Sequence, residues 1–247
     1  MDGNSKVALI TGGTRGIGAG IAKALAADGY RLALNGRIHD EETQALIDQI
    51  GQSKDVIFLE GDVANANTCR TLVEQTVSWF GKIDALVHSA GGAYGGSILE
   101  VNEADWMEAF DIHVHAVFHL FRAAHRQLAR AGGSVLLISS VAGLRGGPEM
   151  VPYQTVKGAL PQLARAMAAS HAHEGIRVNV IAPGIIETRF HANMPADLRK
   201  HHLENRIPLK SFGTVDDVAD AAVALMRNAH ITGEVLAIDG GLAMRKV

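Results

Sequence analysis

Short apolar runs alternate with longer segments of helical periodicity along the whole chain. The apolar runs are continuous rather than interrupted at every second position, as expected for parallel strands that are covered on both faces. Between them, apolar residues recur at the spacing of amphipathic helices. This pattern predicts strands over residues 6–11, 31–36, 55–60, 83–88, 133–139, 176–182 and 234–238. It predicts helices over residues 17–28, 40–51, 66–80, 104–131, 153–173 and 215–228.

Regular alternation of strands and helices is typical of an α/β protein with a doubly wound sheet, whose ligands bind at the carboxyl ends of the strands. The chain has 247 residues and shows no break in composition, no internal repeat and no linker. We therefore expect a single domain over residues 1–247, built on a Rossmann-type seven-stranded parallel sheet flanked by helices. Its cofactor half spans about 1–132, and its catalytic and substrate half spans about 133–247.

A glycine-rich loop follows the first predicted strand. Residues 11–18 read TGGTRGIG and lead directly into an alanine-rich helical segment. Glycines allow a tight turn and a close approach of the backbone to a pyrophosphate, and a helix N-terminus offers free N–H donors. A glycine triplet alone is weak evidence, but strand, loop and helix in this order are the context that a dinucleotide site requires.

Tyr153 and Lys157 lie four residues apart, so a helix through them places both on one face. Ser140 closes the apolar run of the fifth predicted strand. The end of a strand and the start of a helix thus bring a hydroxyl, a phenol and an ammonium to one edge of the sheet. A phenol is a poor base at neutral pH, and we expect the Lys157 ammonium together with an oxidised nicotinamide ring to lower the pKa of Tyr153. These groups are suited to transferring a proton to or from a substrate.

Together these motifs resemble those of the short-chain dehydrogenase/reductase family. The resemblance covers nearly all of the chain and includes HSAG at 88–91, PG at 183–184, ITGE at 231–234 and DGG at 239–241. Within the family, the chain is most similar to the 3-oxoacyl-(acyl carrier protein) reductase branch. The resemblance implies the strand order 3-2-1-4-5-6-7 and a homotetramer.

The resemblance also implies roles for individual residues. Ser140, Tyr153 and Lys157 match the catalytic residues, and His113 stands where the family usually has Asn. His113 would keep a relay water on its backbone carbonyl, titrate near neutrality through its imidazole, or simply bond to nearby backbone. The cofactor-binding residues implied by the match are Gly12, Thr14, Arg15, Gly16, Ile17, Gly18, Arg37, Asp62, Val63, Ala90, Gly91, Tyr153, Lys157, Pro183, Gly184, Ile186 and Thr188.

The end of the second predicted strand indicates which cofactor is preferred. An NAD enzyme usually has an acid there that binds the ribose hydroxyls. This chain has Gly36 at that position, Arg37 after it and Arg15 in the glycine loop. Guanidinium groups bind phosphate bidentately, so we expect NADP(H) rather than NAD(H). The nearby acids Asp40, Glu41 and Glu42 would partly neutralise Arg37. We expect no metal ion.

Composition excludes several classes of partner. A net charge of −3 and a pI near 6.4 give no indication of nucleic-acid binding. The single cysteine, Cys69, cannot form an internal disulfide, which points to a reducing cytosol. A strand that starts at residue 6 leaves no room for a signal peptide, and no apolar run approaches the roughly 18 residues of a membrane span. We therefore expect a cytoplasmic protein.

The substrate is the least determined property. We expect residues 185–209 to form the substrate loop. Acyl carrier proteins are acidic, and Arg122, Arg126 and Arg130 would form a basic docking patch for one. A second basic position of this branch holds Glu174 here, which weakens that assignment.

Three functions stay open at this point. The first is an NADPH-dependent carbonyl reductase, including a 3-oxoacyl thioester reductase. The second is a dehydrogenase of a sugar, polyol or steroid alcohol. The third is a catalytically silent NADP-binding sensor or scaffold.

Overall fold

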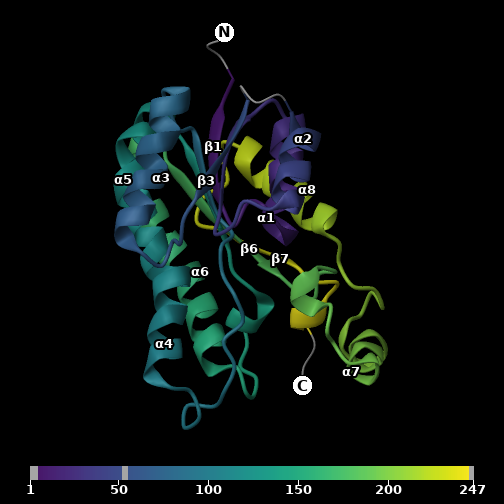
Figure 1. Cartoon of the computed structure of the whole chain (residues 1–247). Helices are drawn as coiled ribbons and strands as arrows, with labels where there is room; N and C mark the ends of the chain where they lie inside the picture. Colours follow the sequence, from purple (N-terminus) through teal and green to yellow (C-terminus); the bar gives the residue numbers. More distant parts are fainter. Residues whose placement is uncertain (1–4, 52–54, 245–247) are drawn as a thin grey trace.

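The computed structural model describes residues 5–51 and 55–244, and their strands form one parallel sheet (Figure 1). The strands are β1 Val7–Thr11, β2 Arg31–Gly36, β3 Val56–Glu60, β4 Ala85–His88, β5 Ser134–Ile138, β6 Arg177–Pro183 and β7 Val235–Ile238. The α-helices are α1 Gly16–Ala27, α2 Glu41–Ile50, α3 Ala66–Phe80, α4 Glu103–Phe110, α5 Ala116–Ala131, α6 Val151–His171, α7 Ala196–His201 and α8 Val215–Arg227. Short π-helices are η1 Asp111–His115 and η5 His202–Arg206, and short 3-10 turns are η2 Val141–Gly143, η3 Ala172–Glu174, η4 Arg189–His191 and η6 Leu242–Met244.

The strand order is β3-β2-β1-β4-β5-β6-β7, which confirms the doubly wound sheet and its expected order. The first three strands run outward from β1 to the edge strand β3, and the chain then returns to place β4 on the other side of β1. The direction of winding therefore reverses between β1 and β4. Such a reversal opens a crevice at the carboxyl ends of the central strands, where α/β proteins bind their ligands.

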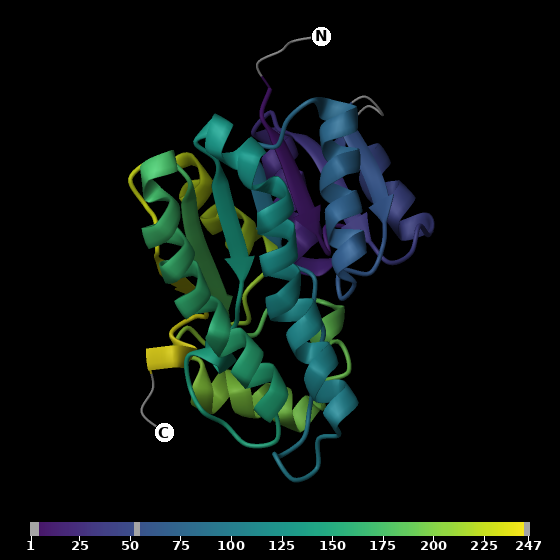
Figure 2. The same cartoon turned by 90° about the vertical axis from the view of Figure 1, so that its left-hand side faces the viewer.

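Helices cover both faces of the sheet (Figures 1 and 2). One apolar core joins the sheet to α3, α5 and α6, and the other joins it to α1, α2 and α8. Successive residues of β1 contribute to opposite cores, Val7 and Leu9 to one and Ala8 and Ile10 to the other. Because both faces are buried, these strands are apolar throughout, as the continuous runs in the sequence predict.

The long helix predicted over 104–131 is divided into α4, η1 and α5. The five residues of η1 form a π-helix, a feature that often marks functional sites. The imidazole of His88, at the end of β4, meets this segment, and its Nε2 lies 3.0 Å from the carbonyl oxygen of Ile112. Nδ1 of the same ring lies 2.8 Å from Oγ1 of Thr11 in β1. His88 therefore braces β1 against η1.

The predicted helix over 153–173 is α6, which continues without a break past Pro161. Pro161 has no N–H, so the carbonyl oxygen of Lys157 has no helical donor four residues on. The hydroxyl of Ser139 donates to that oxygen at 2.7 Å instead. This bond allows a proline inside a buried helix and ties α6 to the end of β5.

The segment expected as the substrate loop contains regular structure. It holds η4, α7 and η5, which lie beside the carboxyl ends of β6 and β7 (Figure 1). None of the described helices combines the length and the apolar character that crossing a lipid bilayer requires.

Candidate active site

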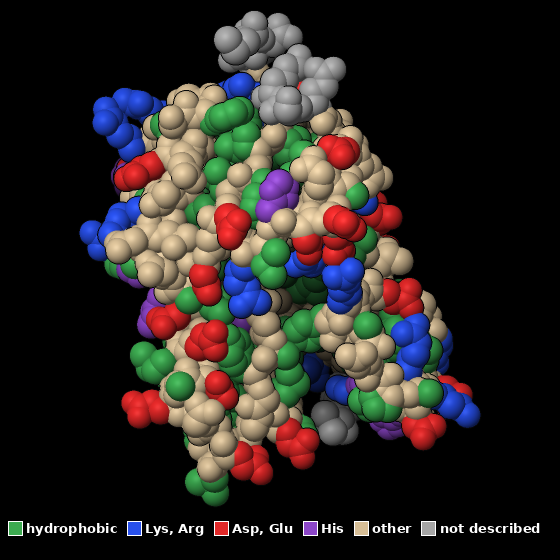
Figure 3. Space-filling model, in the orientation of Figure 1, with side chains coloured by type: hydrophobic (Ala, Val, Ile, Leu, Met, Phe, Trp, Pro, Cys, Tyr) green, Lys and Arg blue, Asp and Glu red, His purple; other side chains and the backbone are tan. Residues whose placement is uncertain are grey.

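A cavity of about 990 Å³ lies at the carboxyl ends of the strands. Figure 3 shows the hollow on the lower half of that face, with Lys and Arg side chains near its rim. Every predicted site residue except Gly18 lines it. Gly18 packs behind the glycine loop, where an added Cβ would lie 2.1 Å from the carbonyl oxygen of Gly12. The structure thus brings together residues from both halves of the sequence at one site.

The glycine loop forms the floor of the cavity between β1 and α1. Gly12 has a φ of 62°, in the left-handed region that favours glycine. The first residues of α1 receive no hydrogen bond from a side-chain cap and include no acid. Gly16 and Ile17, the first two residues of α1, line the cavity, and the first turn carries no acidic side chain. The loop therefore fits the pyrophosphate of a dinucleotide.

The two arginines expected at the adenosine end differ in their surroundings. Arg15 forms ion pairs with Asp40 and with Glu42, the latter at 3.1 Å. Arg189 also pairs with Glu42, at 2.8 Å. The acids thus neutralise Arg15, although the sequence had associated them with Arg37. Arg37 lines the cavity next to Gly36, where an added Cβ would lie 2.8 Å from Oγ1 of Thr14. A larger residue at Gly36, such as the acid of NAD enzymes, would displace the Thr14 side chain.

The remaining predicted cofactor residues lie on loops after the other strands. Asp62 and Val63 follow β3, and the Asp62 carboxylate accepts a hydrogen bond from the N–H of Ala64 at 3.0 Å. Ala90 and Gly91 follow β4. Thr188, after β6, lies next to the glycine loop, where a Cβ added to Gly16 would be 3.6 Å from its Cγ2, and its hydroxyl donates to the Ile186 carbonyl at 3.4 Å. Pro183 ends β6, with Gly184 next to it.

Ser140, Tyr153 and Lys157 meet at the centre of the cavity. Ser140 follows β5, and its hydroxyl is hydrogen-bonded to the Tyr153 phenol in the first turn of α6. Lys157 is 6% exposed and donates from Nζ to the carbonyl oxygen of Ile138 at 2.8 Å. Its Nζ lies 5.8 Å from the centre of the Tyr153 ring. A strand end and one helical face therefore hold the three groups as the sequence predicts.

Burial is the largest influence on the pKa values of Tyr153 and Lys157 in the protein without cofactor. It raises the pKa of Tyr153 above the usual value, and the hydrogen bond with Ser140 only partly opposes that rise. Burial also lowers the pKa of Lys157, to about 7. Without the cofactor, the loss of water around the phenolate therefore sets the direction of the Tyr153 pKa, and the lowering expected from Lys157 together with an oxidised nicotinamide ring stays a prediction for the complex. Tyr153 is a protonated phenol, ready to donate.

His113 lies in η1 and is 1% exposed. Its Nε2 lies 3.1 Å from the carbonyl oxygen of Gly92, an acceptor, so Nε2 carries the proton. Nδ1 is then an acceptor, and it is buried with no partner among the described residues. The ring stands edge-on to the Tyr153 ring, with centres 6.1 Å apart.

The imidazole of His113 stays neutral. Burial, followed by the charge of Lys157, lowers its pKa to about 2. Titration near neutrality, one of the three alternatives left by the sequence, is therefore wrong for this protein. The ring packs directly over Gly91, where an added Cβ would lie 2.0 Å from its Cε1 atom. Gly91 thus provides the space that the histidine occupies.

Several residues that line the cavity were missed from the sequence. They include Tyr94 on the loop after β4, Arg145 and Met150 between β5 and α6, and Gln154 in the first turn of α6. Tyr94 stands edge-on to His113, with ring centres 6.1 Å apart. Within residues 185–209, the expected substrate loop, Phe190, Met194, His202 and Arg206 line the cavity, whereas Arg199, Lys200 and His201 do not. The loops that carry these lining residues follow the carboxyl ends of strands, and this position was the one signal in the sequence that pointed to them.

Comparisons with known proteins match this architecture. A family profile described as Enoyl-(Acyl carrier protein) reductase matches residues 12–243. A 3-oxoacyl-(acyl carrier protein) reductase of Staphylococcus aureus is 32% identical over 244 residues, covering 97% of this chain and 99% of its own. The 3-oxoacyl-(acyl carrier protein) reductase of Homo sapiens is 34% identical over 240 residues, covering 97% and 98%.

Solved structures are similar over the same length. The 3-oxoacyl-(acyl carrier protein) reductase from Brucella melitensis in complex with NAD has a TM-score of 0.91 and 30% identity, covering 99% of both chains. A blue fluorescent protein from a metagenomic library in complex with NADPH has a TM-score of 0.89 and 31% identity, covering 98% of this chain and 100% of its own. With its glycine loop, its Ser140, Tyr153 and Lys157 site and these relatives, the chain belongs to the short-chain dehydrogenase/reductase family and is an NAD(P)-dependent oxidoreductase acting on carbonyl or hydroxyl groups.

Proposed function

We propose that this protein uses NADPH to reduce the 3-oxo group of an acyl thioester to an alcohol. The observation that carries the proposal is the hydrogen-bonded pair of Ser140 and Tyr153, with burial keeping the phenol protonated beside the cavity. A reductase needs a proton donor next to its carbonyl, and a dehydrogenase needs a base at the same place. The protonated Tyr153 phenol supplies the donor that a reductase needs.

The chain's own residues supply position and a proton, while the nicotinamide supplies the hydride when it is bound. The Tyr153 phenol donates its proton to the carbonyl oxygen as that oxygen becomes an alkoxide. The Ser140 hydroxyl donates a hydrogen bond to the same oxygen and fixes its position. Lys157 holds Nζ beside the phenol and the ribose side of the cavity, and its charge stabilises the tyrosinate left behind.

His113 acts in this proposal as a fixed acceptor rather than as a titrating acid. Its Nδ1 has no partner among the described residues and is buried beside Tyr153 and Lys157. After Tyr153 has given its proton to the substrate, a new proton has to reach it past Lys157. A single water bonded to Nδ1 would satisfy this atom and connect it to Lys157. His113 would thus serve the relay through its imidazole, whereas the resemblance implies that the family uses the backbone carbonyl of an asparagine at this position.

The preference for NADPH rests on Arg37. The 2′-phosphate carries negative charge, and Arg37 borders the cavity next to Gly36, which leaves that end without the acid of NAD enzymes. Arg15 contributes less, because its guanidinium is paired with Asp40 and Glu42. The similar structures bind NAD in one case and NADPH in another.

The surface of α5 indicates which kind of carrier holds the thioester. Arg122, Arg126 and Arg130 are all exposed on one face of this helix. Such a stripe suits an acidic carrier protein or the phosphates of coenzyme A. Glu174 does not extend the stripe, because its carboxylate accepts hydrogen bonds from two histidines. We infer that coenzyme A thioesters are also accepted.

We also propose that the protein is cytoplasmic and forms a homotetramer through its two long helical segments, which are α4 with α5 and, after β5, α6. Phe118 is 49% exposed and Met107 is 46% exposed on these helices, which leaves apolar surface for a second copy to cover. The mass measured by light scattering after gel filtration tests this proposal, and a monomer at every concentration would contradict it.

The activity is tested by following NADPH consumption with acetoacetyl-coenzyme A, a 3-oxoacyl carrier-protein thioester and simple ketones. We expect turnover with the thioesters and a loss of at least about 100-fold in Tyr153→Phe, with NADPH binding unchanged. Oxidation of sugars, polyols or steroids alone would favour a dehydrogenase. NADPH binding without turnover of any compound would favour a silent sensor.

A further inference from the structure

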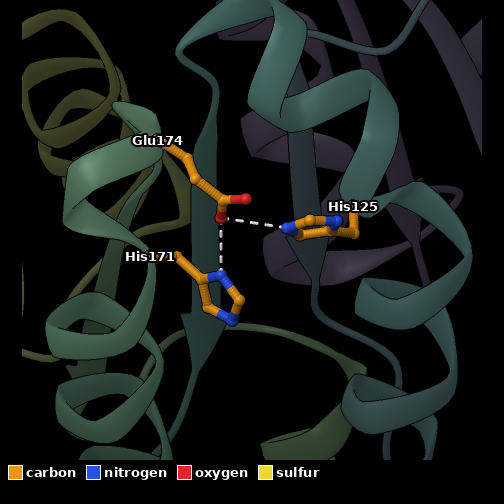
Figure 4. A group of neighbouring side chains, drawn as sticks. All are labelled: His125, His171 and Glu174. Atoms are coloured by element: carbon orange, nitrogen blue, oxygen red, sulfur yellow. Dashed lines mark hydrogen bonds and ion pairs between the residues drawn. The ribbon is translucent and has the colours of Figure 1, made fainter.

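Two histidines and one glutamate meet on the side of the protein formed by α5 and α6 (Figure 4). Nε2 of His125, from α5, lies 2.9 Å from Oε2 of Glu174. Nδ1 of His171, at the end of α6, lies 2.7 Å from the same oxygen. Both rings point at the carboxylate of Glu174 in the turn η3. We propose that these three side chains form a binding site for a zinc ion.

The donor set and its spacing suit this ion. Zinc takes imidazole nitrogens and carboxylate oxygens, each about 2.0–2.2 Å from the metal, in tetrahedral geometry. The three donor atoms here all lie within 4.8 Å of one another. In a tetrahedral site they would be about 3.3 Å apart, so each histidine nitrogen has to move away from the Glu174 oxygen by about half an ångström. Imidazole favours zinc over magnesium and calcium, which prefer oxygen ligands alone.

The surroundings allow an ion to enter and to keep a water ligand. The side chains of His125, His171 and Glu174 are 36%, 27% and 24% exposed. Phe121 lies against both rings and holds them in place, with its centre 4.9 Å from the centre of the His171 ring. Three protein ligands leave the fourth position to water.

The site is separate from the catalytic cavity, because none of the three residues lines that cavity. It connects α5 to the end of α6, across 49 residues of sequence between His125 and Glu174. An ion that binds only the folded chain stabilises it by mass action. The expected effect of zinc is therefore a higher melting temperature rather than a faster reaction. The site also gives a role to Glu174, the residue that departs from the basic pattern of the reductase branch.

The test uses the full untagged chain after treatment with a chelator, titrated with zinc chloride in a calorimeter. We expect one saturable site whose affinity falls by at least about tenfold in Glu174→Gln and in His171→Ala. His173→Ala is the matched control, because His173 is exposed in the same turn but is not part of the cluster, and its affinity should equal that of the wild type. Magnesium chloride should give no binding at this site.

Cobalt(II) provides a second readout, since its visible absorption reports four-coordinate geometry. The wild type should develop this absorption and Glu174→Gln should not. Zinc should also raise the melting temperature of the wild type and leave that of Glu174→Gln unchanged. The proposal is wrong if the wild type binds no zinc, or if Glu174→Gln and His171→Ala bind it as tightly as the wild type. Should His171→Ala fail to fold, the nearly isosteric Glu174→Gln decides the question.

Discussion

The hydroxyl of Ser139 donates a hydrogen bond of 2.7 Å to the backbone carbonyl of Lys157. Both residues are buried, and Pro161 leaves this carbonyl without its helical donor. The bond therefore holds the backbone of the catalytic lysine against the end of β5, next to Ser140. It joins the strand and the helix that carry the reaction.

Replacement of Ser139 by alanine should destabilise the protein by roughly 1–3 kcal/mol, because a buried carbonyl would lose its partner. In a Pro161→Ala background the same replacement should cost less, since an alanine in place of the proline restores an N–H to the helix. Urea denaturation of the two single variants and the double variant measures this coupling. Equal costs of Ser139→Ala in both backgrounds would show that Pro161 does not create the need for the hydroxyl.

Arg37→Ala should weaken NADPH binding by about 10- to 100-fold and leave NADH binding nearly unchanged, because a charged hydrogen bond contributes about 1.5–3 kcal/mol. Arg15→Ala is the comparison variant and should discriminate less between the two cofactors, since Arg15 is already paired with acids. Fluorescence titration with each cofactor gives the four affinities. Equal losses for NADPH and NADH in Arg37→Ala would contradict a role in binding the 2′-phosphate.

His88 and His113 should make the protein sensitive to acid. Burial lowers the pKa of His88 to about 3 and that of His113 to about 2, against 6.5 in an unfolded chain. As the pH falls below 6.5, the unfolded chain therefore binds up to two more protons than the folded one. The free energy of unfolding should fall by up to about 2.7 kcal/mol per pH unit from this pair.

The measurement for this prediction is urea denaturation between pH 7 and pH 5. His88→Asn and His113→Asn remove one imidazole each. In each variant, the part of the fall in free energy of unfolding per pH unit that comes from this pair should be about half of that in the wild type. Curves that stay parallel to the wild type over this range would mean that the histidines are already protonated in the folded state.

In the protein without cofactor, Lys157 should make the free energy of unfolding depend on pH above pH 7. Its pKa is about 7 when folded and 10.5 when unfolded. Between these values the unfolded chain holds a proton that the folded chain lacks, so the free energy of unfolding should rise with pH. Lys157→Met has no group that titrates at this position. The difference in free energy of unfolding between the wild type and this variant should therefore shift in favour of the wild type between pH 7 and pH 9. A constant difference would show that the buried ammonium stays charged.

His113→Asn should retain more activity than His113→Leu if Nδ1 of the histidine serves the relay. Asparagine is the usual family residue and offers polar atoms, whereas leucine fills the space without any acceptor. The two variants are compared by kcat at saturating NADPH and by the dependence of kcat on pH. Equal kcat values in wild type, His113→Asn and His113→Leu would reduce the histidine to a packing role.

The sequence by itself determined the order of strands and helices, the glycine loop and the placement of Tyr153 and Lys157 on one helical face. These features follow from periodicity within short segments, where a period of 3.6 residues or a continuous apolar run has one structural solution. The π-helical break at Asp111–His115 was not predictable in this way, because the apolar pattern continues through it.

The tertiary structure alone decided which charges pair and which groups lose water. Arg15 rather than Arg37 meets the acids of α2, the neutral His113 fits over Gly91, and His125 meets Glu174 from another helix. Each of these contacts joins residues far apart in the chain, so no local pattern contains it. The pKa values of Tyr153 and Lys157 likewise depend on burial, which is a property of the packed molecule.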